Sequence, residues 1–112
     1  MYPLPEKSFE ADPPVERIEE ASGFYFRSII LHRGCFIPQH IHDHDHATLI
    51  GFGRARGWSG EEWIGDKGIG EAFEIESGKT HTFQALEDNT ILICVHDIES
   101  SRSIKEDVCL LQ

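Results

Sequence analysis

The chain has few basic residues and lacks an apolar run long enough to cross a membrane. Ten Lys and Arg stand against twenty Asp and Glu, which gives a formal net charge of −10 at pH 7. Nucleic acids and anionic membrane surfaces bind through clustered Lys and Arg, so neither is an expected partner. A membrane-spanning helix needs about 20 predominantly apolar residues in succession, so no such helix is expected either.

Targeting signals and paired cysteines are lacking as well. Residues 1–6 carry neither the basic start nor the apolar core of a secretory signal. Cys35, Cys94 and Cys109 are odd in number, lie in mainly apolar segments and form no CxxC pair. Buried free thiols in a reducing compartment explain this usage best, and the expected location is the cytoplasm.

No stretch of useful length shows the apolar period of an amphipathic helix. Short segments rich in aromatic and β-branched residues alternate instead with turn residues, glycine above all between positions 51 and 78. Many short strands with frequent turns predict an all-β sandwich or barrel with antiparallel strands. The expected strands are 24–32, 47–52, 73–75, 80–86, 90–96 and, at an edge, 108–111.

The first part of the chain differs in composition from the rest. Residues 1–23 hold four of the five prolines and six acidic residues. They predict an N-terminal arm without regular structure, apart from one turn of helix around 16–21. A chain of 112 residues suffices for one small domain. Residues 24–112 are therefore expected to form a single β domain.

Histidines at alternate positions are the main chemical signal. Residues 40–46 read His-Ile-His-Asp-His-Asp-His. Because side chains alternate in a strand, His40 and His42 can point the same way. Neutral imidazoles are good ligands for transition metals, and His81, in a second apolar stretch, can join them if the sheet curls back. An incidental metal-binding tract is the competing interpretation of the run, and the presence of His81 argues against it.

Alternation also predicts a pocket beside these histidines. A rolled sheet has an inward face formed by every second side chain. The expected inward-facing pocket residues are Thr48, Ile50, Phe52, Arg54 and Phe83, where Arg54 keeps this parity only if no bulge intervenes.

Other residues with side chains suited to a ligand site are three arginines and two tryptophans. Arg27, Arg54 and Arg56 are candidates to clamp a substrate carboxylate, and an exposed Arg54 is an equally good interpretation. Trp58 and Trp63 are expected either to form a pocket wall or to cover the face of a sheet or of a dimer interface.

Two segments resemble the motifs of the cupin superfamily. Residues 34–53 are similar to its first motif: a glycine, five residues, HxH, three or four residues, a glutamate and a later glycine. Residues 70–85 are similar to its second motif, which ends in PxG, a histidine and an asparagine. His46 stands at the glutamate position, Glu76 at the proline and Ala85 at the asparagine.

The resemblance implies a cupin-like antiparallel jelly-roll β-barrel with one metal site. Its ligand set would be His40, His42, His46 and His81, since the family places no ligand at positions 76 and 85. The metal would be one divalent transition ion, with iron, manganese, nickel, copper and zinc left open, while Mg and Ca are disfavoured by imidazole ligands. His44 is interpreted as an exposed loop residue, and His32 and His96 as strand or rim residues.

Several functions are compatible with this site. The favoured hypothesis is a small metal-dependent oxidoreductase, dioxygenase-like, acting on a small organic acid or aromatic compound. The alternatives are a non-catalytic ligand-binding or sensing module, an isomerase or epimerase, and a structural metal. A homodimer is expected, because strands such as 91–95 carry apolar residues on both faces, and their outer face then needs cover from a partner or from the N-terminal arm.

Overall fold

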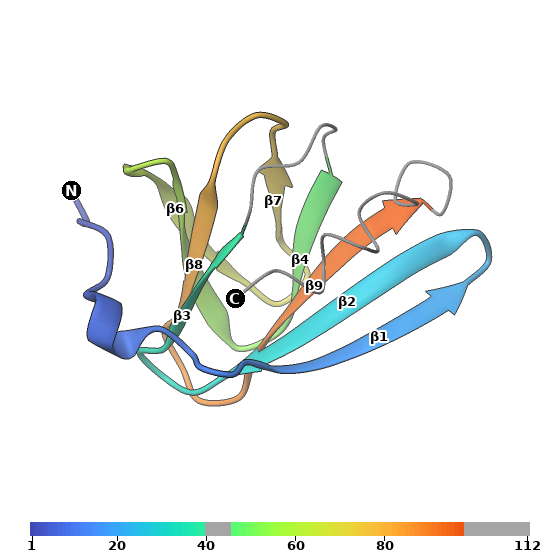
Figure 1. Ribbon diagram of the computed structural model, residues 1–112, viewed down its shortest axis with the longest axis horizontal. Helices are drawn as coiled ribbons and strands as arrows, with labels where there is room; N and C mark the ends of the chain where they lie inside the picture. Colours follow the sequence, from blue (N-terminus) through green and yellow to red (C-terminus); the bar gives the residue numbers. More distant parts are fainter. Residues whose placement is uncertain (40–45, 98–112) are drawn as a thin grey trace.

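The computed structural model describes residues 1–39 and 46–97, and within these residues it consists of two antiparallel sheets (Figure 1). The five-stranded sheet has the order β1-β2-β9-β4-β7 and the four-stranded sheet the order β3-β8-β5-β6. The strands are β1 (Val15–Ala21), β2 (Phe24–Leu31), β3 (Phe36–Gln39), β4 (His46–Phe52), β5 (Arg54–Ser59), β6 (Glu62–Gly68), β7 (Ala72–Ile75), β8 (His81–Ala85) and β9 (Thr90–Asp97).

The core lies between the inner faces of the two sheets. Every second residue of β2 and β9 is buried, from Tyr25 to Leu31 and from Leu92 to His96. Ile37 of β3 and Phe83 of β8 close the core from the other sheet, and both are fully buried. This alternation is the one that the sequence predicts for a sheet with one buried face. The all-β, jelly-roll prediction is confirmed.

Five of the expected strands are present, and four further strands, β1, β3, β5 and β6, were not predicted. β1 lies where a helical turn was expected, and that expectation is wrong: in the described residues the only helix is a 3-10 turn at Lys7–Phe9. β5 and β6 form a hairpin in the glycine-rich stretch that was interpreted as turns. The strand expected at 108–111 lies outside the described residues. In the described part, no helix is long and apolar enough to cross a membrane.

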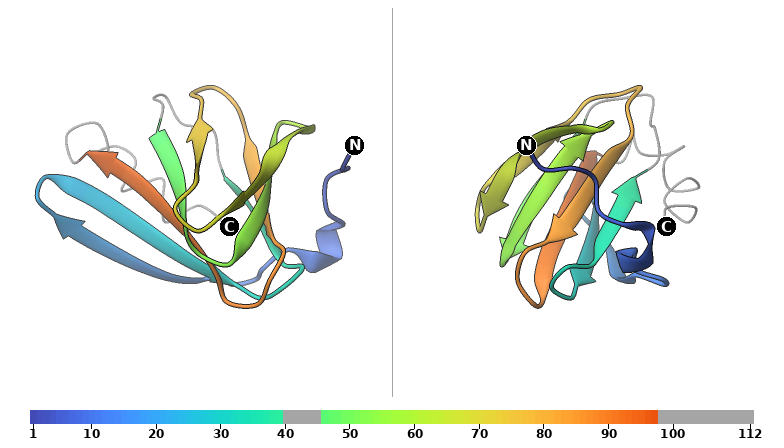
Figure 2. Two further views of the ribbon diagram at one scale, coloured as in Figure 1. Left: turned by 180° about the vertical axis from the view of Figure 1, so that it is seen from behind. Right: turned by 90° about the vertical axis from the view of Figure 1, so that its left-hand side faces the viewer.

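The N-terminal residues cross the outer face of the four-stranded sheet, as the right-hand view of Figure 2 shows. The backbone carbonyl of Tyr2 accepts a hydrogen bond of 2.8 Å from Nε1 of Trp58, whose side chain is fully buried beneath it. The Tyr2 ring stacks on the Arg56 guanidinium, whose carbon lies 3.4 Å from the ring centroid. Trp58 is thus covered by the chain's own arm.

A bidentate ion pair fixes the arginine beneath this arm. Nε and Nη2 of Arg56 donate to the two carboxylate oxygens of Asp66 at 2.8 and 2.9 Å. The hydrogen bond from Arg56, together with one from Trp63, lowers the pKa of Asp66 against the opposing effect of burial. Arg56 therefore has a structural role on the outer face, and it does not reach the interior where a ligand clamp was considered.

Candidate metal centre

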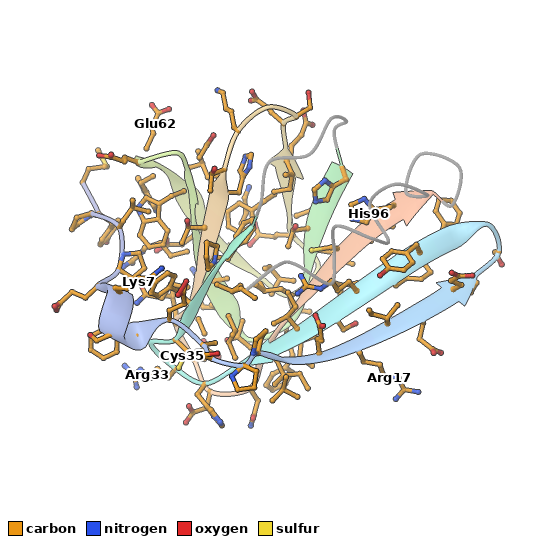
Figure 3. All side chains as sticks on the ribbon, viewed as in Figure 1. Lys7, Arg17, Arg33, Cys35, Glu62 and His96 are labelled. Atoms are coloured by element: carbon orange, nitrogen blue, oxygen red, sulfur yellow. The ribbon has the colours of Figure 1, made fainter. Side chains whose placement is uncertain are left out.

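Three histidines of the described residues sit at element ends and are buried or half-buried. His46 is the first residue of β4, His81 is the first residue of β8, and His96 precedes the last residue of β9. His81 and His96 are 1% and 5% exposed, and His46 is half-buried. Figure 3 shows His96 near the end of β9, at the start of β4. Two of the four predicted metal ligands thus lie at strand starts in opposite sheets.

His46 and His96 stack on each other. Their ring centroids are 4.2 Å apart and their planes are tilted by 34°. The register explains the contact: Ala47 pairs with Val95 and Thr48 with Cys94, so the two histidines face each other one residue further along the antiparallel strands. Beyond them, Tyr25 of β2 pairs with His96, and its ring lies 6.1 Å away. One row across the sheet thus places two imidazoles beside a tyrosine.

His81 lies on the facing sheet in a dry environment. Burial lowers its pKa below the ordinary value of 6.5, while a backbone group of Lys79 and the charge of Glu76 act in the opposite direction. Its Nδ1 atom is buried and has no hydrogen-bond partner among the described residues. A neutral imidazole with an unsatisfied buried nitrogen suits metal ligation, because only the neutral ring has a lone pair to offer.

The described residues on either side of positions 40–45 belong to opposite sheets. β3 ends at Gln39, which pairs with His81, and β4 begins at His46. His40, His42 and His44 lie outside the described residues, so the placement of two predicted ligands stays a prediction. Within residues 1–39 and 46–97, no three His, Cys, Asp or Glu side chains form a group that could hold a metal ion. The imidazoles of His46 and His81 are suitable transition-metal ligands, but two ligands alone do not hold a metal ion.

Two cavities open beside these histidines. One, of about 320 Å³, is lined by His81 of β8, Lys67 of β6 and residues of β7. The other, of about 510 Å³, is lined by His46 and Ala47 of β4 and by β7. Both cavities include Ala72, Phe73 and Glu74, so they lie along the same edge strand. Space for a small ligand therefore adjoins both histidines.

The five predicted pocket residues do not share one location. Ile50 and Phe83 are buried in the core, and Thr48 is buried with its Oγ1 3.5 Å from the Sγ of Cys94. Phe52, by contrast, is 50% exposed, and Arg54 is exposed too. The register shifts between Ile50 and Phe52, which is the bulge that the parity argument excluded. The prediction that Phe52 and Arg54 face the interior is therefore wrong.

Arg27, one of three arginines considered for a carboxylate, is the one that the structure places inside. Its side chain is fully buried on the inner face of β2, opposite Cys94 of β9. Its Nε donates to Oε2 of Glu16 at 2.6 Å. The sequence signal for this placement was the alternation Tyr25, Arg27, Ile29, Leu31, in which the arginine takes a core position.

His96 is the residue that the sequence argument underrated. It was interpreted as an ordinary strand or rim residue, yet it packs on a predicted ligand. Its parity with the buried Leu92 and Cys94 could have indicated the inner face. Its partner could not have been predicted, because the pairing of β9 with β4 joins residues 50 positions apart.

Comparison with known proteins supports the fold. No protein-family model matches the chain, and no curated protein matches it by sequence. Solved structures do match. KdgF from Halomonas sp. has a TM-score of 0.64 at 20% identity, covering 76% of this chain and 78% of its own. An RmlC-like cupin protein from Desulfovibrio desulfuricans has a TM-score of 0.62 at 19% identity, covering 78% and 85%.

A third match is a cupin superfamily protein from Desulfitobacterium hafniense, with a TM-score of 0.63 at 11% identity over 77% of this chain and 78% of its own. At these identities the likeness concerns the backbone fold. The chain therefore has the fold of cupin and RmlC-like proteins, in agreement with the motif resemblance. The fold alone does not assign an activity, because similar scaffolds host unrelated sites.

Proposed function

We propose that the chain binds one divalent transition metal ion through His40, His42, His46 and His81 and uses it to act on a small organic acid or aromatic compound. The observation that carries the proposal is the position of His46 and His81. His46 ends the histidine run at the start of β4, and His81 pairs with Gln39, the residue that precedes the run. The motif resemblance independently predicts the same ligands.

The described residues prepare the site in two ways. Burial lowers the pKa of His81, so its ring stays neutral and available to a metal at neutral pH. The His96 ring packs on His46 and limits its rotation, which orients a ligand before the metal arrives. When bound, the metal would supply Lewis acidity and, for iron or copper, electron transfer with dioxygen.

An oxidoreductase, dioxygenase-like, is the favoured activity, and a non-catalytic ligand-binding or sensing module is the second candidate. The cavities beside His46 and His81 provide space for a small molecule in either case. The candidates differ in turnover. The iron- or copper-loaded protein of an oxygenase consumes O₂ with its substrate, and a binding module does not. An isomerase or epimerase would convert its substrate without consuming O₂.

Metal analysis of protein purified without a histidine tag tests the proposal first. We expect close to one transition metal ion per chain, sharply reduced in His81→Ala and in His46→Ala. His32→Ala is the matched control, because His32 is exposed on the loop after β2. An oxygen-uptake screen with small acids and aromatics then tests the oxidoreductase, and His40→Ala should abolish any uptake found.

Two results would overturn parts of this assignment. Full metal content in His81→Ala would remove His81 from the ligand set. Loss of metal in His44→Ala together with retention in His46→Ala would show that the motif is out of register by two residues.

A further inference from the structure

Arg27 is a buried cation whose charge is only partly neutralised. Arg27 is fully buried. The side chain of Glu16, which forms an ion pair with it, is 31% exposed. Glu16 accepts from Nε alone, while Nη1 and Nη2 are buried without a hydrogen-bond partner among the described residues. These two nitrogens carry most of the donors of a guanidinium. Burying them unsatisfied is costly, and proteins rarely retain such a group without use.

The register places Arg27 on the same inner face as His96. Tyr25 pairs with His96 and Arg27 with Cys94, so Arg27 and His96 are diagonal neighbours on the inner face. Diagonal neighbours in antiparallel sheets are about 7–8 Å apart at the backbone, within the reach of a long side chain. His46 stacks on His96 from the next strand. A ligand that extends from these rings along the inner face toward β2 would therefore approach Arg27.

We infer that Arg27 binds a carboxylate group of the ligand, with Nη1 and Nη2 donating to its two oxygens. The two free nitrogens present the fork that a planar carboxylate accepts in a bidentate manner. A singly charged carboxylate is favoured over a phosphate, because Glu16 already places one negative charge on the same guanidinium. The inference rests on the proposed function and specifies it: the substrate is an organic acid, anchored by β2.

The test uses untagged full-length protein and matched probes. Acetate and benzoate are each compared with their neutral amides, acetamide and benzamide, and with inorganic phosphate. Thermal unfolding and titration calorimetry are run on EDTA-treated and on metal-loaded protein. A ligand that binds only the folded chain raises the melting temperature, so binding is read without any activity. We expect at least one carboxylate to stabilise the EDTA-treated protein, and its amide not to.

Three variants test whether carboxylate binding depends on Arg27. Arg27→Lys should weaken carboxylate binding by about tenfold or more, because an ammonium cannot form the bidentate pair. Glu16→Gln should strengthen it, because the guanidinium then lacks a competing negative charge, and this variant leaves Arg27 in place should Arg27→Lys fold poorly. Arg17→Lys is the matched control. Arg17 lies on the neighbouring strand β1, exposed and directed away from the sheet in Figure 3.

The outcomes separate this inference from the metal proposal. If carboxylates stabilise only the metal-loaded protein, and Arg27→Lys responds as the wild type does, the carboxylate binds the metal and the inference is wrong. If carboxylates stabilise EDTA-treated wild type but not Arg27→Lys, and no metal binds, the inference stands and the metal proposal fails. Phosphate binding more tightly than either carboxylate, or Glu16→Gln weakening the binding, would also overturn the inference.

Discussion

The imidazole rings of His46 and His96 lie 4.2 Å apart, centroid to centroid, on the paired strands β4 and β9. One of these histidines is a predicted metal ligand and the other is not. The stack joins the end of the histidine run to the penultimate residue of the last strand of the described fold. The ring of His46, a predicted metal ligand, therefore contacts a residue that the motifs do not contain.

We therefore expect His96→Ala to weaken metal binding without removing it. Loss of the stacked ring frees His46 to rotate, and supporting residues of this kind typically affect metal affinity by about 10–100-fold. His96→Phe keeps an aromatic ring in place and should retain more of the affinity. Competition with a chelator of known affinity measures the difference. Equal affinity in wild type and His96→Ala would show that the stack has no role at the site.

The metal-free protein should lose stability as the pH falls below about 6.5, in part through His81. Burial lowers the pKa of this residue in the folded chain from its ordinary value of 6.5. Between these two pKa values the unfolded chain binds more protons at this position, so the free energy of unfolding decreases as the pH falls through this window. His81→Gln should flatten that part of the pH profile, measured by urea unfolding in EDTA. His32→Gln serves as the exposed control, and an unchanged slope in His81→Gln would contradict the prediction.

Gly57 is expected to tolerate no side chain. A Cβ at this position would lie 2.7 Å from Cε1 of Phe73, whose ring packs on Phe83 at 5.1 Å in the core. Because a ring held in the core cannot move aside easily, Gly57→Ala should lower the free energy of unfolding by about 1–3 kcal/mol.

Gly51→Ala is the matched control for this substitution. Its Cβ would meet Cδ1 of Ile93 at 2.9 Å, the mobile end of a flexible side chain. Urea unfolding should therefore show a smaller loss of stability for Gly51→Ala than for Gly57→Ala, and the reverse order would contradict the packing argument.

We propose that the outer face of the five-stranded sheet forms a homodimer interface. This face carries Ile30, Val15 and Phe24, which are 42%, 63% and 44% exposed, together with the half-buried Ile93 and Leu49. The N-terminal arm covers the other sheet instead, as the hydrogen bond from Trp58 shows.

A second copy suits this surface by charge as well as by polarity. Arg17 and Glu19 both lie on the outer side of β1, paired with Ser28 and Phe26, so two copies in antiparallel contact can exchange opposite charges. Ile30→Glu should shift the mass measured by light scattering from dimer to monomer. Ile69→Glu, at an exposed turn residue that is 66% exposed, should not. A monomeric wild type at micromolar concentration would refute the dimer.

The sequence alone determined the fold class and the chemistry of the candidate donors. Alternating burial in strands such as β2 and β9 could be predicted because it depends on local polarity, which each residue carries with it. The histidine spacing indicated a metal site because ligand chemistry, too, is a property of the individual side chains. The β5–β6 hairpin was not predictable, because its glycines favour turns and only pairing with β8 and the packing of Phe73 on Gly57 make them strand residues.

Tertiary structure decided which residues of similar type have different roles. Arg27 and Arg54 were both considered for a substrate carboxylate, and only Arg54 was placed in the predicted pocket. A bulge after Ile50 left Arg54 exposed, while sheet pairing buried Arg27. Trp58 became core because the N-terminal arm folds over it, a contact between residues 56 positions apart. His96 joined the site through its pairing with β4. Register and long-range pairing follow from the sum of many contacts across the sheets, which no single segment of the sequence contains.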